Sequence, residues 1–556
     1  MPTLEELVEA GRAGRMVDLT DGDPEHRESV DASMLAEVLA SGPRAVRLKG
    51  ARITGELDLS ALTIECPLWL DSCFFEQAVL LAETQAKSIS LRDSHVPALV
   101  AQDLRTSGSL HLNGLTADNI VLLMNAHIGG HLEVAGAELG GSGPGALIAN
   151  GVVVDGHLIG SDLTVRGVVL LSDANVGRDV SLEDANLGAL RAGSMTVAGS
   201  VSCRGCTATG PMWLAGTKIG NHLDLAGARL SNADGIALEA SEVTVGRDLR
   251  ADSGFTADGE IHLVNADIGG RVLFTDATVK AALMADGCAV GDDLELGPEL
   301  TAAGSISLHG ARVDGHVRFN GTSSVVAGET ALNLARLRAD SLLLFPREPF
   351  QGKVDLSRAQ VREFYDLPES WSPEMAAFGF TYQVLRNDFL PVRERLSWLR
   401  RATVEYDPGA YDQLSAAYRR GGQVEAARRV GLAKQRHRRD MLNPLGRLWN
   451  RLLSVTVGYG YRTWLAGLWL VLLVALGTLL FGGAYRTNMR PTAPAGPAFQ
   501  PVAYSLDVLV PIVDLGQKKA WFARGPAQAW SWVFTGAGWV LTTAVVAGVT
   551  NALKRD

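Results

Sequence analysis

The chain has 556 residues, of which 61 are glycine and only 6% are aromatic, while 47% are apolar and the mean hydropathy is +0.11. This apolar content excludes wholesale disorder, and a net charge of −10 argues against nucleic acid as a partner of the whole chain. Five cysteines are too few for a disulfide framework, and the first ten residues show no secretory signal, so we expect the main body to be cytoplasmic.

Residues 1–43 predict a helical cap. Apolar residues recur at helical spacing over Leu4 to Gly11 and over Ser29 to Leu39. A cap is expected in front of a β-structured repeat array, because a bare end exposes unpaired strand edges to other chains.

A short unit recurs over residues 44–361. It reads glycine, one or two residues, an aliphatic residue, one residue and a second apolar residue, as in Gly130-His-Leu-Glu-Val134 and Gly315-His-Val-Arg-Phe319, and units follow one another about every 10–11 residues. The leading aliphatic residues of a longer repeat, spaced by 48, 43, 49 and 45 positions, are Leu132, Val180, Leu223, Val272 and Val317. We interpret this period of about 46 residues as two coils of about 23 residues, and each coil has the sequence pattern of two short strands.

Alternation within each unit has period two, which is typical of strands. Each coil buries its aliphatic residues only by stacking on the next coil, which predicts a β-solenoid of ~14 coils and roughly 65 Å at ~4.8 Å per strand spacing. A β-sandwich of many short strands is the alternative, but its turns would not keep the long period. The fold class that we predict is mainly β: a right-handed-type β-solenoid (β-helix) rod, then an α-helical joint and two transmembrane helices.

Side chains at two kinds of position on the coils are expected to be structural. His131, His157, His222 and His316 precede the leading aliphatic residue and point outward; Asp179 and Arg271 intervene in the same column and argue against a metal ladder. The Cys203-Arg-Gly-Cys206 motif aligns with apolar core positions of the repeat, so we expect core packing there and not redox or metal chemistry.

Residues 362–442 are expected to be helical. Tyr411, Leu414 and Tyr418 follow helical spacing until Gly421-Gly422 breaks it, and the pattern then resumes. This predicts a tetratricopeptide-like hairpin over 408–440. Because such arrays need about three repeats to bind a peptide, we interpret the single hairpin as a structural joint.

Two uncharged stretches, 463–485 and 525–553, exceed the ~20 residues that cross hydrocarbon and predict transmembrane helices. Residues 443–462 are expected to form a basic amphipathic interfacial helix, and residues 486–524 an extracytoplasmic or re-entrant segment. The basic residues that we expect to bind anionic lipid of the cytoplasmic leaflet are Arg428, Arg429, Lys434, Arg436, Arg438, Arg439, Arg447, Arg451 and Arg462. This excess of basic residues places the solenoid and both termini in the cytoplasm, as part of a two-pass protein of the cytoplasmic (inner) membrane.

The apolar stretch 501–517 between the two predicted spans is a candidate pore or re-entrant segment. Its candidate residues are Tyr504, Asp507, Asp514 and Gln517. Acids in an apolar stretch near a membrane are costly and tend to be functional. The alternative is an extracytoplasmic cap that packs on the spans.

The solenoid, the Tyr411 to Arg439 hairpin, Gly458-Tyr-Gly-Tyr-Arg462 and Gly538-Trp-Val-Leu-Thr-Thr543 together resemble an actinobacterial-type family of membrane-anchored β-solenoid repeat proteins. The coils are also similar to pentapeptide-repeat solenoids. Members of the family are often labelled membrane-associated oxidoreductases, so the resemblance implies a redox activity, although no residue of the sequence points to electron transfer.

The leading hypothesis is a non-enzymatic, membrane-tethered cytoplasmic scaffold that binds proteins or assembles with its own copies. One alternative is an oligomeric pore or channel-like protein that uses residues 501–517, and the other is the membrane-associated oxidoreductase of the family label. We expect no catalytic residues, no cofactor, no metal and no nucleic-acid partner; lipid and an unidentified protein partner, or self-association, are expected instead.

Overall fold

The computed structural model describes residues 2–20, 28–140, 145–325, 327–386, 390–403, 406–440, 464–493 and 496–553. The chain divides into two compact units. The first comprises Met1–Pro391 with Ser397–Val404, and the second comprises Val392–Leu396 with Glu405–Asp556.

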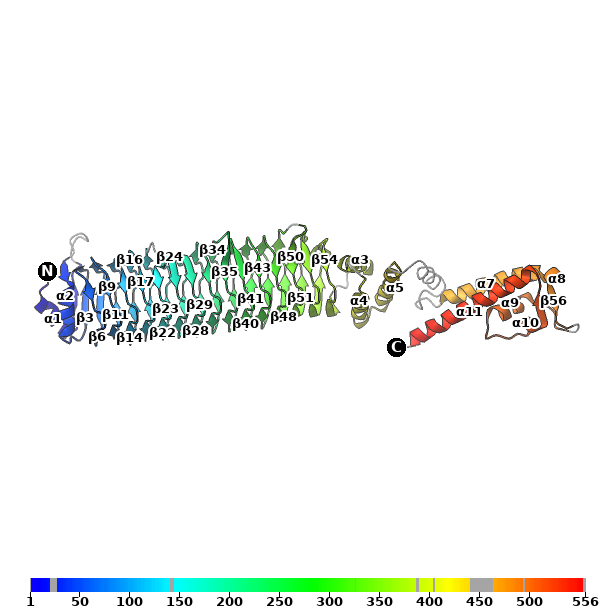
Figure 1. Ribbon diagram of the computed structural model, residues 1–556, viewed down its shortest axis with the longest axis horizontal. Coiled ribbons are helices and arrows are strands. Elements are labelled where there is room, and N and C mark those ends of the chain that lie inside the picture. The colour runs from blue at the N-terminus through cyan, green and yellow to red at the C-terminus, as the bar shows by residue number, and fades with distance from the viewer. Residues whose placement is uncertain are drawn as a thin grey trace. The chain divides into compact units, whose positions relative to one another are not determined.

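Two helices, α1 (Leu4–Ala13) and α2 (Ala32–Ala40), lie at the N-terminal end of the first unit (Figure 1). Thr3 and Glu6 form a reciprocal capping box at α1, and the Asp31 carboxylate accepts a hydrogen bond from the Ser33 backbone N–H at the start of α2. Two strands accompany these helices. β1 (Met16–Asp18) pairs with β3 (Val46–Lys49), and β2 (Ser29–Asp31) pairs with β4 (Arg52–Thr54), so the first coil continues both sheets.

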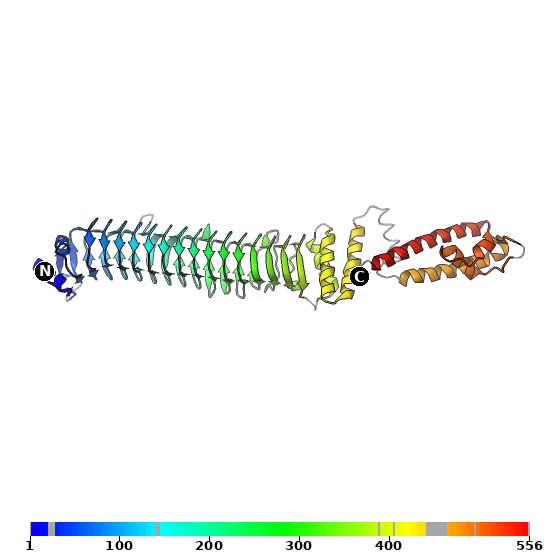
Figure 2. The same ribbon diagram turned by 90° about the horizontal axis from the view of Figure 1, so that it is seen from below.

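A β-solenoid of about 16 turns follows, which confirms the predicted mainly β solenoid fold and exceeds the predicted number of about 14 coils. Among the described residues its strands form two parallel sheets of 28 and 27 strands. Figure 2 shows the strands of successive coils stacked side by side. In some coils two strands merge into one longer strand, as in β24 (Thr164–Leu170), but a typical coil has four short strands and not two. In one coil these are β7 (Leu68–Asp71), β8 (Phe74–Phe75), β9 (Val79–Leu80) and β10 (Gln85–Ala86).

Alternation of side chains builds the core of the solenoid. In β19 (Leu132–Glu133), Leu132 is buried and Glu133 is half-buried on the outside, and the next residue, Val134, is buried again. Leu110 and Leu158 pair with Leu132 in the coils on either side, so each aliphatic residue stacks on its equivalents. Because the core is a set of such columns, each coil is stabilised only by its neighbours.

All five cysteines are buried as free thiols. Cys203 and Cys206 lie in the core, and a hydrogen bond with Cys206, together with burial, raises the pKa of the Cys203 thiol. Burial raises the pKa of Cys288 to about 12. The Cys203 and Cys288 thiols are therefore protonated at neutral pH.

Glycine is required where the chain turns between two strands of one sheet. Gly220, Gly246 and Gly291 occupy this corner in three coils, and an added Cβ at each would lie 2.1, 2.1 and 2.3 Å from a carbonyl oxygen of the preceding coil. No side chain fits at such a separation. The close stacking of coils at this corner therefore accounts for part of the high glycine content.

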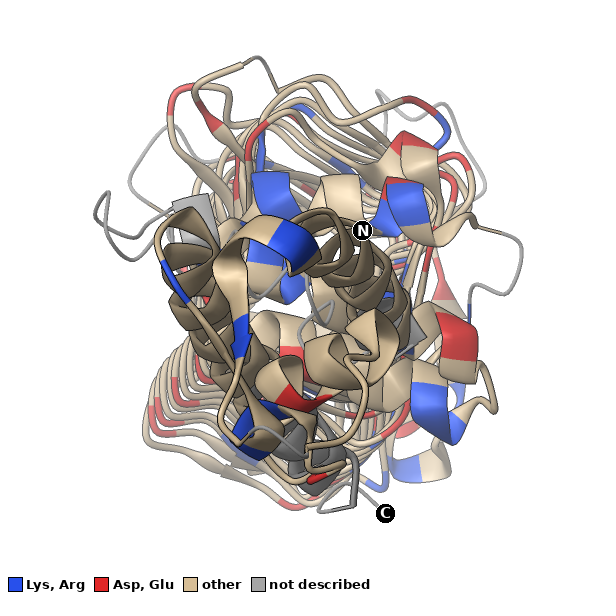
Figure 3. Ribbon diagram, turned by 90° about the vertical axis from the view of Figure 1, so that its right-hand side faces the viewer, with Lys and Arg blue, Asp and Glu red and all other residues tan. Residues whose placement is uncertain are grey.

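A second corner requires a left-handed backbone. Asp173 and Asp184 have φ angles of 59° and 54°. Aspartate, asparagine and glycine adopt this conformation most readily. Acidic residues consequently recur at corners of successive coils (Figure 3), for a conformational reason that is independent of any binding role.

Strands β53 (Gln360–Asp366), β54 (Met375–Ala376) and β55 (Thr381–Leu385) form the C-terminal end of the solenoid, where β55 stacks on β53 of the preceding coil. The second half of helix α3 (Val392–Ala402), from Ser397 onward, covers it. The Trp398 indole N–H lies 3.0 Å from the Met375 sulfur, and the Ala377 N–H donates to the Ala402 carbonyl at 2.8 Å. Both ends of the solenoid are therefore covered, which opposes the end-to-end stacking of copies.

The second unit begins with an antiparallel pair, α4 (Pro408–Arg420) and α5 (Val424–Asp440). Tyr411, Leu414 and Val430 are buried between these helices, and the Tyr411 hydroxyl lies 2.9 Å from Nδ1 of His437.

Helices α7 (Trp464–Gly483) and α11 (Pro526–Leu553) pack on the short helix α9 (Pro501–Leu509). Helix α8 (Tyr485–Asn488), strand β56 (Met489–Pro491), helix α10 (Gln517–Ala520) and strand β57 (Trp521–Ala523) complete this part, and the two strands pair antiparallel. Phe481, Tyr504 and Phe534 form its buried centre. A Cβ at Gly538 would lie 1.7 Å from the Leu509 carbonyl oxygen, so glycine permits this close contact between α11 and α9.

The two predicted membrane spans, 463–485 and 525–553, are not found as such. Within the described part of the chain, no helix is both long enough and apolar enough to cross a membrane. The predicted interfacial helix over 443–462 lies outside the described residues.

The glycine corner is testable by substitution. Gly246→Ala places a methyl group against the Gly220 carbonyl, and we expect it to lower the free energy of unfolding by about 1–3 kcal/mol, as overpacking does. Gly193→Ala is the control, because the nearest atom to its Cβ is 3.6 Å away. Thermal unfolding followed by circular dichroism compares the two; equal midpoints would contradict the proposed role of the corner.

Candidate functional site

A hydrogen-bond ladder runs along one corner of the solenoid, at the residue that precedes the first strand of each coil. The Ser109 hydroxyl accepts from the His131 backbone N–H at 2.9 Å, and Nδ1 of His131 accepts from the His157 N–H at 3.0 Å. Further steps join His157 to Asp179, Asp179 to Ser200, Ser200 to His222, His222 to Asp248 and Asp248 to Arg271, at 3.3, 2.8, 3.4, 3.3 and 2.9 Å. One side chain per coil thus binds the backbone of the next coil.

The backbone ladder between coils is interrupted at this residue. Leu132 N–H, one residue further on, donates to the His157 carbonyl, whereas the His131 N–H has a side chain as its acceptor. A partly buried N–H without an acceptor would cost about 1–3 kcal/mol. Serine, aspartate and the Nδ1 atom of neutral histidine each supply an acceptor close to the main chain, which explains why these three residue types share the column.

The histidines therefore point outward, as the repeat alignment predicts, and His131, His157 and His222 accept in this ladder. Nδ1 of His316 makes no hydrogen bond to any described residue, and its backbone N–H donates to the Asp293 carboxylate. Where Nδ1 accepts, Nε2 carries the proton in the neutral ring. Across the described ranges of the chain, no three metal-ligating side chains come together.

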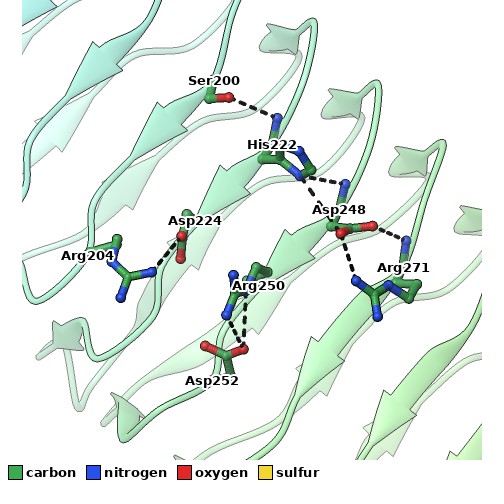
Figure 4. A network of polar contacts seen from close by, with 8 residues as sticks. All are labelled: Ser200, Arg204, His222, Asp224, Asp248, Arg250, Asp252 and Arg271. Carbon is green, nitrogen blue, oxygen red and sulfur yellow. Dashed lines mark hydrogen bonds and ion pairs between the residues drawn. The ribbon is translucent and has the colours of Figure 1, made fainter.

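Paired charges flank the ladder around His222 (Figure 4). Asp248 pairs with Arg271 at 3.1 Å, and its carboxylate lies 3.9 Å from Nδ1 of His222. Two neighbouring ion pairs, each at 3.1 Å, are Arg204–Asp224 and Arg250–Asp252. Burial opposes ionisation of Asp248, but the backbone N–H and the guanidinium of Arg271 outweigh it and hold the pKa of this carboxyl below its usual value.

A similar cluster surrounds Glu133 in an earlier part of the solenoid. Its carboxylate lies 3.2 Å from Arg92, 2.9 Å from His111 and 2.7 Å from the Asn113 amide. Burial raises the pKa of Glu133, and hydrogen bonds from His111 and Asn113, with Arg92, lower it below the usual value. Asp248, Asp224 and Glu133 pair with residues of other coils, so these contacts hold coils together, whereas Arg250 and Asp252 belong to the same coil.

Of the four candidate residues of the 501–517 segment, the structure brings Asp507 and Gln517 together, in the second unit. Asp507 is buried at 5% exposure, and its carboxylate accepts backbone N–H groups of Leu515, Gln517 and Lys518 at 2.5, 2.8 and 3.1 Å. These bonds hold the loop after α9 and the start of α10. They also satisfy the carboxylate, so the buried acid has a structural explanation.

The side chains of the other three candidates of this segment have separate surroundings. Tyr504 packs edge-to-face on Phe481 with ring centroids 5.0 Å apart. The Gln517 side chain accepts from the Gln500 N–H at 3.1 Å and donates to the Ala498 carbonyl at 3.2 Å. Asp514 is exposed and pairs with Lys519.

Only part of the expected lipid-binding residues is described. Arg428, Arg429, Arg436 and Arg438 are exposed on α5. Arg428 pairs with Glu425 at 3.2 Å, and Lys434 pairs with Asp412 at 2.6 Å. Arg447, Arg451, Arg462 and the side chain of Arg439 lie outside the described residues.

The surface of α7 and α11 is apolar where it faces away from the buried centre. On α7, Leu479 is 75% exposed and Val471 is 65% exposed; on α11, Trp532 is 68% exposed and Trp539 is 60% exposed. An open apolar groove of about 610 Å³ lies between α7 and α9, lined by Val471, Leu479, Val502 and Leu506 among others. Exposed apolar surface of this extent marks an interaction with lipid or protein.

No protein-family model matches the chain, and neither a curated protein nor a solved structure is detectably similar to it. The resemblance to membrane-anchored repeat proteins therefore stays a prediction.

The sequence did not indicate the ladder acceptors Ser109, Ser200, Asp248 and Asp293 as a group. Alignment of the repeats places these residues in the same column as the four histidines. The feature that could have identified the ladder is that Ser, Asp and His side chains can all accept a hydrogen bond.

Two substitutions at Asp248 separate its charge from its role as an acceptor. Asp248→Asn keeps an oxygen for the Arg271 N–H and loses the ion pair, so we expect it to be about 1–3 kcal/mol less stable than the unsubstituted chain at pH 7. Because the folded-state pKa is depressed, that stabilisation is present above the ordinary carboxyl pKa near ~3.9 and is lost as pH falls through the lower folded value. The difference should therefore shrink in acid.

Asp248→Ala also removes the acceptor, so its deficit should persist in acid. Unfolding in denaturant between pH 3 and pH 7 measures both variants, with Asp173→Asn in an exposed left-handed turn as the control. A deficit of Asp248→Asn that did not change with pH would contradict the assignment.

Proposed function

We propose that the chain is a membrane-associated scaffold: the β-solenoid is its cytoplasmic binding part, and the C-terminal helices are its attachment to the membrane. The observation that carries this proposal is the apolar outer surface of α7 and α11. Leu479 and Trp532 remain 75% and 68% exposed although Phe481 and Phe534, on the same two helices, are fully or nearly fully buried.

Lipid is the environment that suits this surface best. The uncharged stretches 463–485 and 525–553 contain these residues, and the basic residues between 428 and 462 suit anionic headgroups of the cytoplasmic leaflet. The excess of basic residues over acidic ones between 428 and 462 supports a cytoplasmic location of the solenoid and of both termini. The membrane is then the inner one.

A scaffold role follows from how the solenoid uses its polar groups. His131 and His222 of the ladder bind backbone N–H groups, and Asp248 and Glu133 pair with basic residues of other coils. Groups engaged in this way hold a regular surface in place. Solenoids with such surfaces serve as extended binding platforms.

One observation favours a pore as a second candidate. Helix α9 lies between α7 and α11, and the loop that follows it exposes Ile512 at 80% and Leu515 at 52%. A short helix and loop between two long helices is similar to the layout of two-span channels. Against this, the Asp507 charge is bound to three N–H groups and does not face a pathway. The absence of ion flux in proteoliposomes that contain the chain would exclude the pore.

The oxidoreductase implied by the resemblance has no supporting residues in the described structure, since Cys203 and Cys206 are buried in the core and the pKa of the Cys203 thiol is raised. A purified chain that neither carries nor binds flavin or nicotinamide would exclude it.

Membrane attachment is tested with the full-length chain. We expect it to float with membranes on a density gradient and to resist alkaline carbonate extraction. The double variant Val471→Asp/Leu479→Asp should shift much of the chain to the soluble fraction, because each acid on a lipid-facing surface costs about 2.5–3.5 kcal/mol.

Val424→Asp is the matched control, since Val424 is 55% exposed on α5 and its substitution should leave the distribution unchanged. Recovery of the unsubstituted chain in the soluble fraction would overturn the proposed function.

A further inference from the structure

One side of the solenoid carries an aliphatic stripe. Strands β9, β13 (Leu99–Val100), β17 (Val121–Leu122), β21 (Leu147–Ile148) and β24 (Thr164–Leu170) stack in register on this side. Their outward residues, which we call the aliphatic stripe, are Leu80, Val100, Leu122, Ile148 and Leu170, all of them half-buried. At the equivalent outward position, strands on another side of the solenoid carry polar residues, such as Glu133 in β19.

The stripe residues and their immediate flanks contain no charge, although β24 carries Arg166 four residues before Leu170. Residues 78–82, 98–102, 120–124, 146–150 and 168–172 include no Lys, Arg, Asp or Glu. The same side becomes polar further along the chain, where Arg191 is exposed and His262 lies 3.2 Å from Glu239. The uncharged block is therefore a local feature of five coils and not a property of the fold.

The size of this block is significant for a regular surface. Five strands ~4.8 Å apart and five residues ~3.3 Å apart give roughly 20 by 15 Å, on the order of 300 Å². Met124 extends it at one edge with 38% exposure. An apolar patch of about 300 Å² is comparable to the largest patch on a typical monomer, which is often functional.

We propose that the aliphatic stripe is a lateral interface between two copies of this chain. Because the block lacks charge, it offers nothing to a charged ligand. Its ridges repeat at the spacing of parallel strands, and a second copy presents ridges of the same spacing. Leu122 lies in the middle strand, so a two-fold axis there makes the stripe complementary to itself.

The area predicts that this interface is weak in free solution. Two copies would bury on the order of 600 Å², about half of what stable complexes bury. Attachment of copies to one membrane raises their effective concentration and compensates for a small interface. In this respect the inference rests on the proposed function.

Cysteine cross-linking in isolated membranes tests the interface. All five native cysteines are buried, so their background reaction should be low. Leu122→Cys should form a disulfide-linked homodimer on mild oxidation with copper phenanthroline. Thr116→Cys is the matched control, since Thr116 is half-buried on the neighbouring side of the same coil, in β16 (Thr116–Ala117).

We expect several-fold more homodimer for Leu122→Cys than for Thr116→Cys. If Leu80→Cys and Leu170→Cys chains cross-link only when they are mixed, the two copies are antiparallel. If each variant forms a homodimer on its own, the copies are parallel. Both results support the interface. Equal yields at positions 122 and 116, no homodimer at 122, or a cross-link to a different protein would each overturn it.

Leu122→Asp provides a second measurement that does not depend on cross-linking. It should reduce the dimer that a lysine-reactive cross-linker captures in membranes, while the circular dichroism spectrum remains that of the unsubstituted chain. Fractionation of the same samples keeps the two proposals separate. A chain in the membrane fraction without a dimer contradicts the interface alone, whereas a chain in the soluble fraction contradicts the membrane attachment.

Discussion

Parallel hydrogen bonding between successive coils is the constraint on which the first unit depends. Each strand bonds to its equivalent about 4.8 Å away, so every position in a coil faces the same position in the next. A position that suits one coil must suit its neighbours. Aliphatic columns such as Leu110, Leu132 and Leu158 follow from this constraint, and so do the glycines at the tight corner.

The constraint is hardest to satisfy at one corner, where one backbone N–H per coil bonds to a side chain, although the N–H before it bonds to a carbonyl, as Gly130 does to Gly108. The solenoid solves this with side-chain acceptors at the residue before each first strand. Asp507 solves a related problem in the second unit, where its carboxylate binds three N–H groups of a loop. In both cases a residue that looks functional in the sequence completes the hydrogen bonding of the main chain.

Outward positions between the corners are less constrained, and function is expected there. Some of those that carry charge are paired with other coils, as Asp248 is with Arg271. Apolar outward residues form the aliphatic stripe of the solenoid, and further exposed apolar residues cover the outer surface of α7 and α11. The proposed scaffold uses the first for copies of itself and the second for the membrane.

The sequence predicts the solenoid well, because the glycine and aliphatic positions recur with a clear period. It does not resolve four strands per coil, since strands of two residues, such as β19, leave almost no alternation to read. Strand β1 was missed because its partner β3 lies some 30 residues away. The role of Asp507 depends on the fold of residues 510–518, which no local pattern encodes. The sequence does not indicate the aliphatic stripe, because both residues of pairs such as Val79-Leu80 are apolar and resemble core residues.

Residue-resolved amide hydrogen exchange tests the central claim, that side chains complete the hydrogen bonding between coils. The N–H groups of Leu158, Leu223 and Leu249 bond to backbone carbonyls. We expect the N–H groups of His157, His222 and Asp248, which bond to side chains, to exchange as slowly as these three. Exchange of the His157, His222 and Asp248 N–H groups as fast as that of exposed turn amides would contradict the claim.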